Sequence, residues 1–84
     1  EEDNIQALTK LFLETRPDST PKIIHDIVEQ IDKIVKATRF DGWQGTQKGK
    51  REIQRALIVT LAQFGLGKDK ELFQKAYDYI EEHY

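Results

Sequence analysis

Apolar residues recur at helical spacing in four separate segments of this chain. The clearest segment runs from Ile24 to Val35, where isoleucines and valines return at intervals of three and four residues. A strand would place alternate members of this run on opposite faces, and polar pairs interrupt the run. We therefore predict a helix over about residues 21–38, with one apolar face turned to a core.

The same periodicity predicts a first helix over residues 2–14 and two further helices in the second half of the chain. The stripe of the first helix consists of Ile5, Leu8, Leu11 and Phe12. The stripe of the third consists of Ile53, Ala56, Leu57, Thr60, Leu61 and Phe64, and that of the fourth of Leu72, Phe73, Ala76, Tyr77 and Ile80. Because large apolar side chains are stabilised by burial, the helices are expected to share one core.

Residues with capping and turn chemistry separate these helices. Residues 15–19 contain a proline and form a predicted breaker, since the residue before a proline is disfavoured in a helix. Thr20, Thr46 and Asp69 are predicted to cap the second, third and fourth helices, because their side-chain oxygens accept hydrogen bonds from free amides at a helix start. Gly65 is suited to the left-handed conformation that closes a helix.

These elements predict an all-α fold, a compact bundle of three to four amphipathic helices in a single domain over residues 1–84. Residues 1–19 provide the first helix and the breaker, and residues 20–84 provide the rest. A content of 38% hydrophobic and 33% charged residues suits a small helical domain. The chain starts with Glu1 rather than Met, so we expect it to be a piece of a longer protein.

Charge is unevenly distributed along the chain, although its net value is only −2. Eight acidic and three basic residues in 1–32 give −5, and five acidic and three basic residues in 56–84 give −2. Between them, seven basic and two acidic residues in 33–55 give +5. The middle of the chain is thus a cationic segment in a protein whose isoelectric point is near 5.7.

The connector between the second and third helices, with the helix start that follows it, covers residues 39–52 and holds the only Trp and three of the five glycines. A simple connector does not require a Trp flanked by glycines, so this segment is expected either to pack in a specific way or to present a surface. Aromatic residues and Arg are enriched at protein interfaces. The candidate partner-binding residues are Arg39, Phe40, Trp43, Lys48, Lys50 and Arg51. The sequence leaves open whether Trp43 belongs to the core or to an interface.

An alternative is that residues 39–55 contact nucleic acid. Lys and Arg side chains neutralise phosphates, and an aromatic ring such as that of Trp43 stacks on a base. Domains dedicated to nucleic-acid binding are usually basic overall, which disfavours this alternative for an acidic chain.

No catalytic, cofactor-binding or metal-binding residues are predicted. Residues 45–51 lack the glycine spacing, and the Ser or Thr after Lys, that a phosphate-binding P-loop requires. His25 and His83 have no Cys and no second His at ligand spacing, so no zinc site is expected. The absence of Cys suits a reducing compartment, and no apolar run has the length that spans a membrane.

Two stretches of the chain resemble a known family. Residues 31–46, which include Arg39-Phe40-Asp41-Gly42-Trp43, resemble a segment near the end of the R subunit of type I restriction–modification enzymes. Residues 71–84, which begin Glu-Leu-Phe-Gln-Lys-Ala-Tyr, resemble the extreme C-terminus of those subunits. The resemblance covers roughly residues 20–84, and the first helix matches only loosely.

This resemblance implies a non-catalytic assembly domain that docks the ATP-dependent translocase and endonuclease subunit onto the methyltransferase core. The implied partner is the methyltransferase (M) subunit, with weak or indirect contact to DNA and no contact with a membrane. ATP and magnesium are used elsewhere in the family's chain, so no cofactor is expected in this part. The implied location is the cytoplasm.

Overall fold

The computed structural model describes residues 2–84, and in this part of the chain the secondary structure is entirely helical, as predicted. The helices are α1 (Glu2–Thr15), α2 (Pro21–Thr38), the short 3-10 helix η1 (Trp43–Gly45), α3 (Gln47–Gln63) and α4 (Lys70–His83). The predicted bounds of the first two helices hold to within one residue. The sequence did not predict η1, which lies inside the connector.

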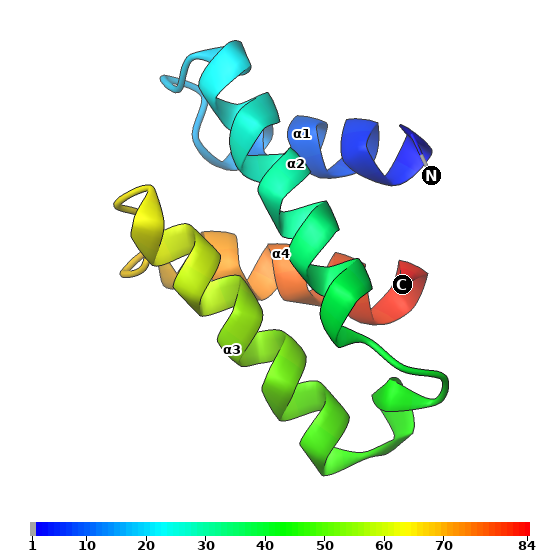
Figure 1. The fold of residues 1–84 in the computed structure, drawn as a ribbon. Coiled ribbons are helices and arrows are strands. Elements are labelled where there is room, and N and C mark those ends of the chain that lie inside the picture. The colour runs from blue at the N-terminus through cyan, green and yellow to red at the C-terminus, as the bar shows by residue number, and fades with distance from the viewer. Residues whose placement is uncertain (1) are drawn as a thin grey trace.

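The four α-helices form two layers (Figure 1). Helices α2 and α3 run side by side in opposite directions, and α1 and α4 cross behind them. Helix α1 packs on both α2 and α4, and α3 packs on α2, on η1 and on α4. The layer of α1 and α4 therefore covers one face of the α2–α3 layer. No helix of residues 2–84 covers the opposite face, which we call the outer face.

The predicted stripes of the four helices meet in one core. Its fully buried apolar residues are Leu8, Phe12, Ile24, Ile27, Val28, Ile31, Val35, Trp43, Ile53, Leu57, Leu61, Leu72, Ala76, Tyr77 and Ile80. Two predicted stripe residues are instead 39% exposed, namely Ile34 and Phe64. Each residue of an α-helix advances about 100° around the helix axis, so Ile34 lies at the edge of the apolar stripe of α2 while its neighbour Val35 points into the core. Phe64 is exposed because it caps the end of α3 and has already left the helical conformation.

Two of the three predicted N-terminal caps form. The Thr46 hydroxyl accepts a hydrogen bond from the Gly49 amide at 2.9 Å, and the Asp69 carboxylate accepts one from the Leu72 amide at 3.0 Å. Thr20 occupies the capping position of α2 and has the extended backbone of a capping residue, but its side chain accepts no hydrogen bond from the helix. The predicted side-chain cap is therefore wrong. Helix α2 starts instead with a proline, whose missing N–H needs no acceptor at that position.

The C-terminal end of α3 closes as the sequence predicts. Gly65 adopts a positive φ of 77°, a conformation that costs glycine little because it has no Cβ. The Leu66 amide then donates to the Leu61 carbonyl at 2.8 Å, and the Gly65 amide donates to the Ala62 carbonyl at 3.0 Å. This pair of bonds is the Schellman arrangement, which turns the chain sharply towards α4.

Asp69 also joins the start of α4 to the breaker after α1. Its Oδ2 accepts a hydrogen bond and ion pair from Arg16 Nη1 at 2.5 Å. The pKa of the Asp69 carboxyl lies below its usual value, first because the Leu72 amide donates to it and then because Arg16 does. The two connections at this end of the bundle are thereby held together.

The connector between α2 and α3 is anchored in the core by Trp43. The Trp43 side chain is 1% exposed and meets the ring of Tyr77 edge to face, with ring centroids 6.5 Å apart. Gly49 lies directly beside Trp43. A Cβ added to Gly49 would lie 2.6 Å from the carbonyl oxygen of Trp43 and 2.8 Å from the Cβ of Trp43. The interpretation of Trp43 as a surface anchor is therefore wrong, because its ring fills the space between η1 and the helices.

We predict that Gly49→Ala destabilises the fold. Overpacking a tight contact costs about 1–3 kcal/mol, more than the ~0.5–1 kcal/mol that Ala gains over Gly inside a helix. A loss of 1 kcal/mol lowers the melting temperature by about 4–8 °C in a domain of this size. Thermal melts followed by circular dichroism measure the change. The matched control is Gly45→Ala, whose Cβ meets nothing within 4 Å; equal melting temperatures for the two variants would contradict the assigned contact.

Candidate partner-binding surface

The six residues proposed from the sequence to bind a partner fall into three groups in the structure. Trp43 is buried in the core, as described above. Arg39 and Lys50 are engaged within the molecule: Arg39 Nη1 donates to the Tyr84 carbonyl oxygen at 3.0 Å, and Lys50 Nζ pairs with Glu81 Oε2 at 3.3 Å. The remaining three residues are exposed, and they are Phe40, Lys48 and Arg51.

Arg39 belongs to a polar clasp between the ends of α2 and α4. The Tyr84 hydroxyl donates to Asp32 Oδ1 at 2.5 Å, and Lys36 Nζ pairs with Asp32 Oδ2 at 3.2 Å. Asp32 is only 7% exposed, so its carboxylate depends on these partners. Burial raises the pKa of Tyr84 far above its usual value, and the adjacent Asp32 adds to the rise. The raised pKa keeps the Tyr84 phenol in its protonated form, which donates the hydrogen bond to Asp32.

Sequence reasoning did not find this clasp. Asp32 and Lys36 stand four residues apart, a spacing that is common on solvated helix faces. The partner from α4 lies 52 residues further along the chain, and no local pattern links it to Asp32.

Three cations line one side of α3. Lys48, Arg51 and Arg55 follow each other at intervals of three and four residues, which places them along one side of a helix. Together with Glu52 they surround a shallow hollow of about 220 Å³. All three are exposed, and within residues 2–84 none of them takes part in an ion pair or hydrogen bond. We call Lys48, Arg51 and Arg55 the α3 cation row.

A groove runs beside the cation row, between α2 and α3. Its volume is about 450 Å³, and its lining residues are Gln30, Ile34, Thr38, Glu52, Arg55, Ala56, Val59, Thr60 and Gln63. The apolar side chains in its middle, Ile34 and Val59, are 39% and 51% exposed. Sequence reasoning missed this groove because it assigned Ile34 to the core stripe of α2. The usable signal was Val59, an apolar residue outside the predicted stripe of α3.

The exposed large apolar side chains are concentrated on this half of the molecule. Among the described residues they are Ile23, Ile34, Phe40, Ile58, Val59 and Phe64. All six come from α2, the connector, α3 and the residue that caps α3. In the described part of α1 and α4, by contrast, large apolar side chains are at least partly covered.

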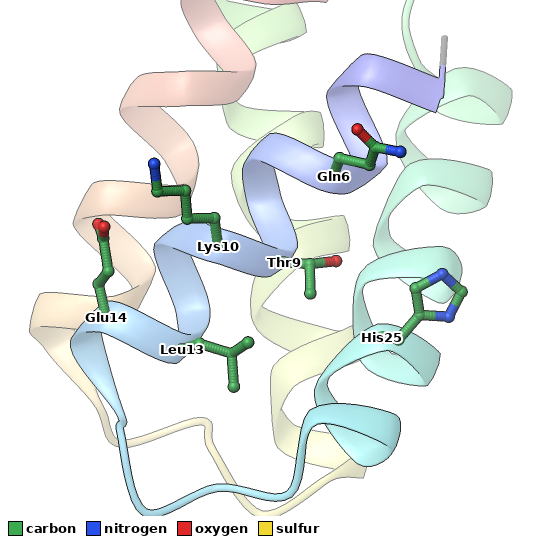
Figure 2. A pocket seen from close by; sticks show the side chains of 6 residues that line it. All are labelled: Gln6, Thr9, Lys10, Leu13, Glu14 and His25. Atoms are coloured by element: carbon green, nitrogen blue, oxygen red, sulfur yellow. The ribbon is translucent and has the colours of Figure 1, made fainter.

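A second hollow lies on the other side of the molecule, between α1 and the start of α2 (Figure 2). Its volume is about 400 Å³, and its lining residues are Gln6, Thr9, Lys10, Leu13, Glu14 and His25. Figure 2 shows Thr9 and Leu13 pointing into the space between the helices, whereas Lys10 and Glu14 extend away from His25. The Thr9 hydroxyl in this lining donates to the Ile5 carbonyl at 2.7 Å, an ordinary hydrogen bond within a helix.

The same end of α2 carries a cluster of potential metal ligands. Ligand atoms of His25, Asp26 and Glu29 all lie within 4.8 Å of one another, and His25 Nδ1 is 3.8 Å from Glu29 Oε1. All three side chains are exposed on one helix turn. Exposed acidic groups at this spacing are common on solvated helices, so the sequence-based expectation that no metal binds here stays a prediction.

Comparisons with known proteins leave the family resemblance as a hypothesis. No protein-family model, no curated protein and no solved structure matches this chain. None of the helices in residues 2–84 combines the length and the apolar content that crossing a lipid bilayer requires.

We predict that Tyr84→Phe and Asp32→Ala destabilise the protein through the same interaction. A hydrogen bond to a charged group contributes about 1.5–3 kcal/mol, so each single variant should unfold at lower denaturant concentration. In a double-mutant cycle, the double variant should lose clearly less than the sum of the two single losses. Urea unfolding curves supply the free energies of unfolding. Strictly additive losses would show that the clasp contributes no coupling.

Proposed function

We propose that this chain is a non-catalytic assembly domain, which docks a larger subunit onto a partner protein through the α2–α3 half of its surface. The observation that carries this proposal is that the six exposed large apolar side chains of residues 4–84 all lie on α2, the connector, α3 and the residue that caps α3. Exposed apolar side chains that gather on one part of a surface are typical of sites that bind other macromolecules.

The resemblance of residues 31–46 and 71–84 to R subunits supplies the identity of the partners in this proposal. The larger subunit is the translocase and endonuclease subunit of a type I restriction enzyme, and the partner is its methyltransferase core. The parent chain uses ATP and magnesium elsewhere and acts in the cytoplasm. In this role the domain needs no catalytic groups of its own.

The connector contributes an aromatic contact to the proposed docking surface. Phe40 is 42% exposed, and it precedes the buried Trp43 by three residues on the same connector. Trp43 fixes the connector in the core, and its amide donates to the Phe40 carbonyl at 3.0 Å, so the backbone at Phe40 is ordered before a partner arrives. A residue whose backbone is already ordered loses less conformational entropy on binding, which favours affinity. Phe40 therefore replaces Trp43 as the aromatic anchor in this proposal.

We predict that Phe40→Ala weakens assembly with the methyltransferase subunit without unfolding the domain. Truncating a buried interface anchor commonly costs at least about 2 kcal/mol, or roughly 30-fold in Kd. Lys48→Ala and Arg51→Ala should have smaller effects, mainly on the association rate. Biosensor binding to the purified methyltransferase subunit measures Kd and both rates.

The matched control for this experiment is Phe64→Ala, because Phe64 is similarly exposed but caps the opposite end of α3. Each variant must also show the melting temperature of the unaltered chain. If Phe40→Ala melts and binds normally, or if Phe64→Ala weakens binding to the same extent, the connector is not the anchor.

Contact with nucleic acid is the second candidate function, and the unpaired α3 cation row favours it. The buried ring of Trp43 does not stack on a base, which leaves Phe40 as the exposed aromatic ring of residues 39–55. Three phosphate contacts would give a slope of about −3 in a plot of log K against log salt for duplex DNA. We predict only weak binding that disappears near physiological salt, measured by fluorescence anisotropy. Tight binding that persists at such salt would favour the nucleic-acid function.

A further inference from the structure

We infer that the groove between α2 and α3 receives an acidic amphipathic helix of the partner protein. This inference rests on the proposed docking function and specifies its chemistry. It is carried by three features of the outer face: the shape of the groove, its exposed apolar centre, and the unpaired cations at one of its ends.

The groove has the shape that a third helix requires. Helices α2 and α3 run side by side in opposite directions (Figure 1). The lining residues early in α2 therefore lie near the lining residues late in α3. Gln30 and Gln63 accordingly stand at one end of the groove, and Thr38 and Glu52 stand at the other. A channel between two nearly parallel ridges of side chains is the geometry in which a further helix packs.

The centre of the groove favours an apolar helix face. Ile34 on α2 and Val59 on α3 remain 39% and 51% exposed, and the small side chain of Ala56 lies one turn before Val59. The large side chains supply apolar area, and the small one leaves room for a side chain of the incoming helix. Covering Ile34 and Val59 removes apolar surface from water, which stabilises the complex.

The cation row determines the charge of the incoming helix. Arg55 lines the groove itself, and Arg51 and Lys48 continue the row past the end formed by Thr38 and Glu52. Glu52 is the one acidic residue that lines both the groove and the hollow between these cations. Within residues 2–84 they have no ion-pair partner, so Asp or Glu side chains along the edge of the incoming helix can pair with them. Charge complementarity of this kind steers association and fixes orientation.

Two alternative occupants of the groove, a second copy of this chain and a nucleic acid, fit these features less well. In a symmetric dimer with its two-fold axis at the middle of the groove, the α3 cation row of one copy would meet the Gln30 and Gln63 end of the other, whose lining residues offer no carboxylate to pair with it. A nucleic-acid backbone would pair with the cations but would leave Ile34 and Val59 facing a hydrated phosphate chain. An acidic helix is the occupant that satisfies both the apolar centre and the cationic end.

Designed peptides test the chemistry of the groove directly. The acidic probe is a helical peptide of about 18 residues, or five turns, with Leu on one face and Glu beside it. The basic probe is the same peptide with every Glu replaced by Lys. Fluorescence anisotropy with the 84-residue chain should give a Kd for the acidic probe at least about ten-fold lower than for the basic probe, and the difference should shrink with salt. Equal affinities for the two probes would overturn the inference.

Variants of neighbouring residues then locate the binding site. Val59→Ser should weaken binding of the acidic probe by about ten-fold, because it removes an apolar contact. Ile58→Ser is the matched control, since Ile58 is 46% exposed on the same helix but does not line the groove. Arg55→Glu should weaken the acidic probe and strengthen the basic one, whereas Lys68→Glu, in the α3–α4 turn, should do neither. Unchanged binding by Val59→Ser, in a protein that melts normally, would overturn the inference.

The methyltransferase subunit as ligand separates this inference from the proposed function. If the unaltered chain and Val59→Ser bind that subunit equally well, the docking function stands and the groove inference fails. If the chain does not bind the subunit but Val59→Ser and Arg55→Glu change peptide binding as expected, the groove stands and the identity of the partner fails. A 20-base-pair DNA duplex that displaces the acidic probe at physiological salt would overturn the inference in favour of nucleic acid.

Discussion

The contact of Trp43 with Gly49 determines how the rest of the structure is arranged. Because no Cβ fits at Gly49, the connector lies directly against the first turn of α3, with the Trp43 ring turned into the core. The chain therefore leaves α2 and enters α3 in the opposite direction, with the two helices side by side. The outer face, its groove and its cation row exist only in this arrangement.

A second interaction, the hydrogen bond between Tyr84 and Asp32, holds the two layers of helices together. It joins the end of α2 to the end of α4, while Lys50 and Glu81 join the start of α3 to α4. Polar residues that hold the layers together are thus paired with α4 or the C-terminal Tyr84. Lys36, Arg39 and Lys50 are engaged in these contacts, whereas Lys48, Arg51 and Arg55 remain unpaired among the described residues, in a row on α3.

Local patterns predicted the helices well, because helix formation and capping depend on residues within one or two turns of each other. The apolar spacing from Ile24 to Val35, the capping oxygens of Thr46 and Asp69, and the left-handed Gly65 all act at this range. The sequence therefore predicted the fold class and most of the helix ends.

The surface was predicted less well, because the burial of one side chain depends on elements far away in the chain. Trp43 has an aromatic ring that suits a core and an interface equally, and only its position beside Gly49 decides between them. Ile34 and Val59 line the groove from two different helices, so neither helix alone reveals it. The most direct test is methyl NMR of the chain titrated with the methyltransferase subunit. We expect the methyl signals of Ile34 and Val59 to shift while those of Leu13 do not; shifts confined to Leu13 would contradict docking through the groove.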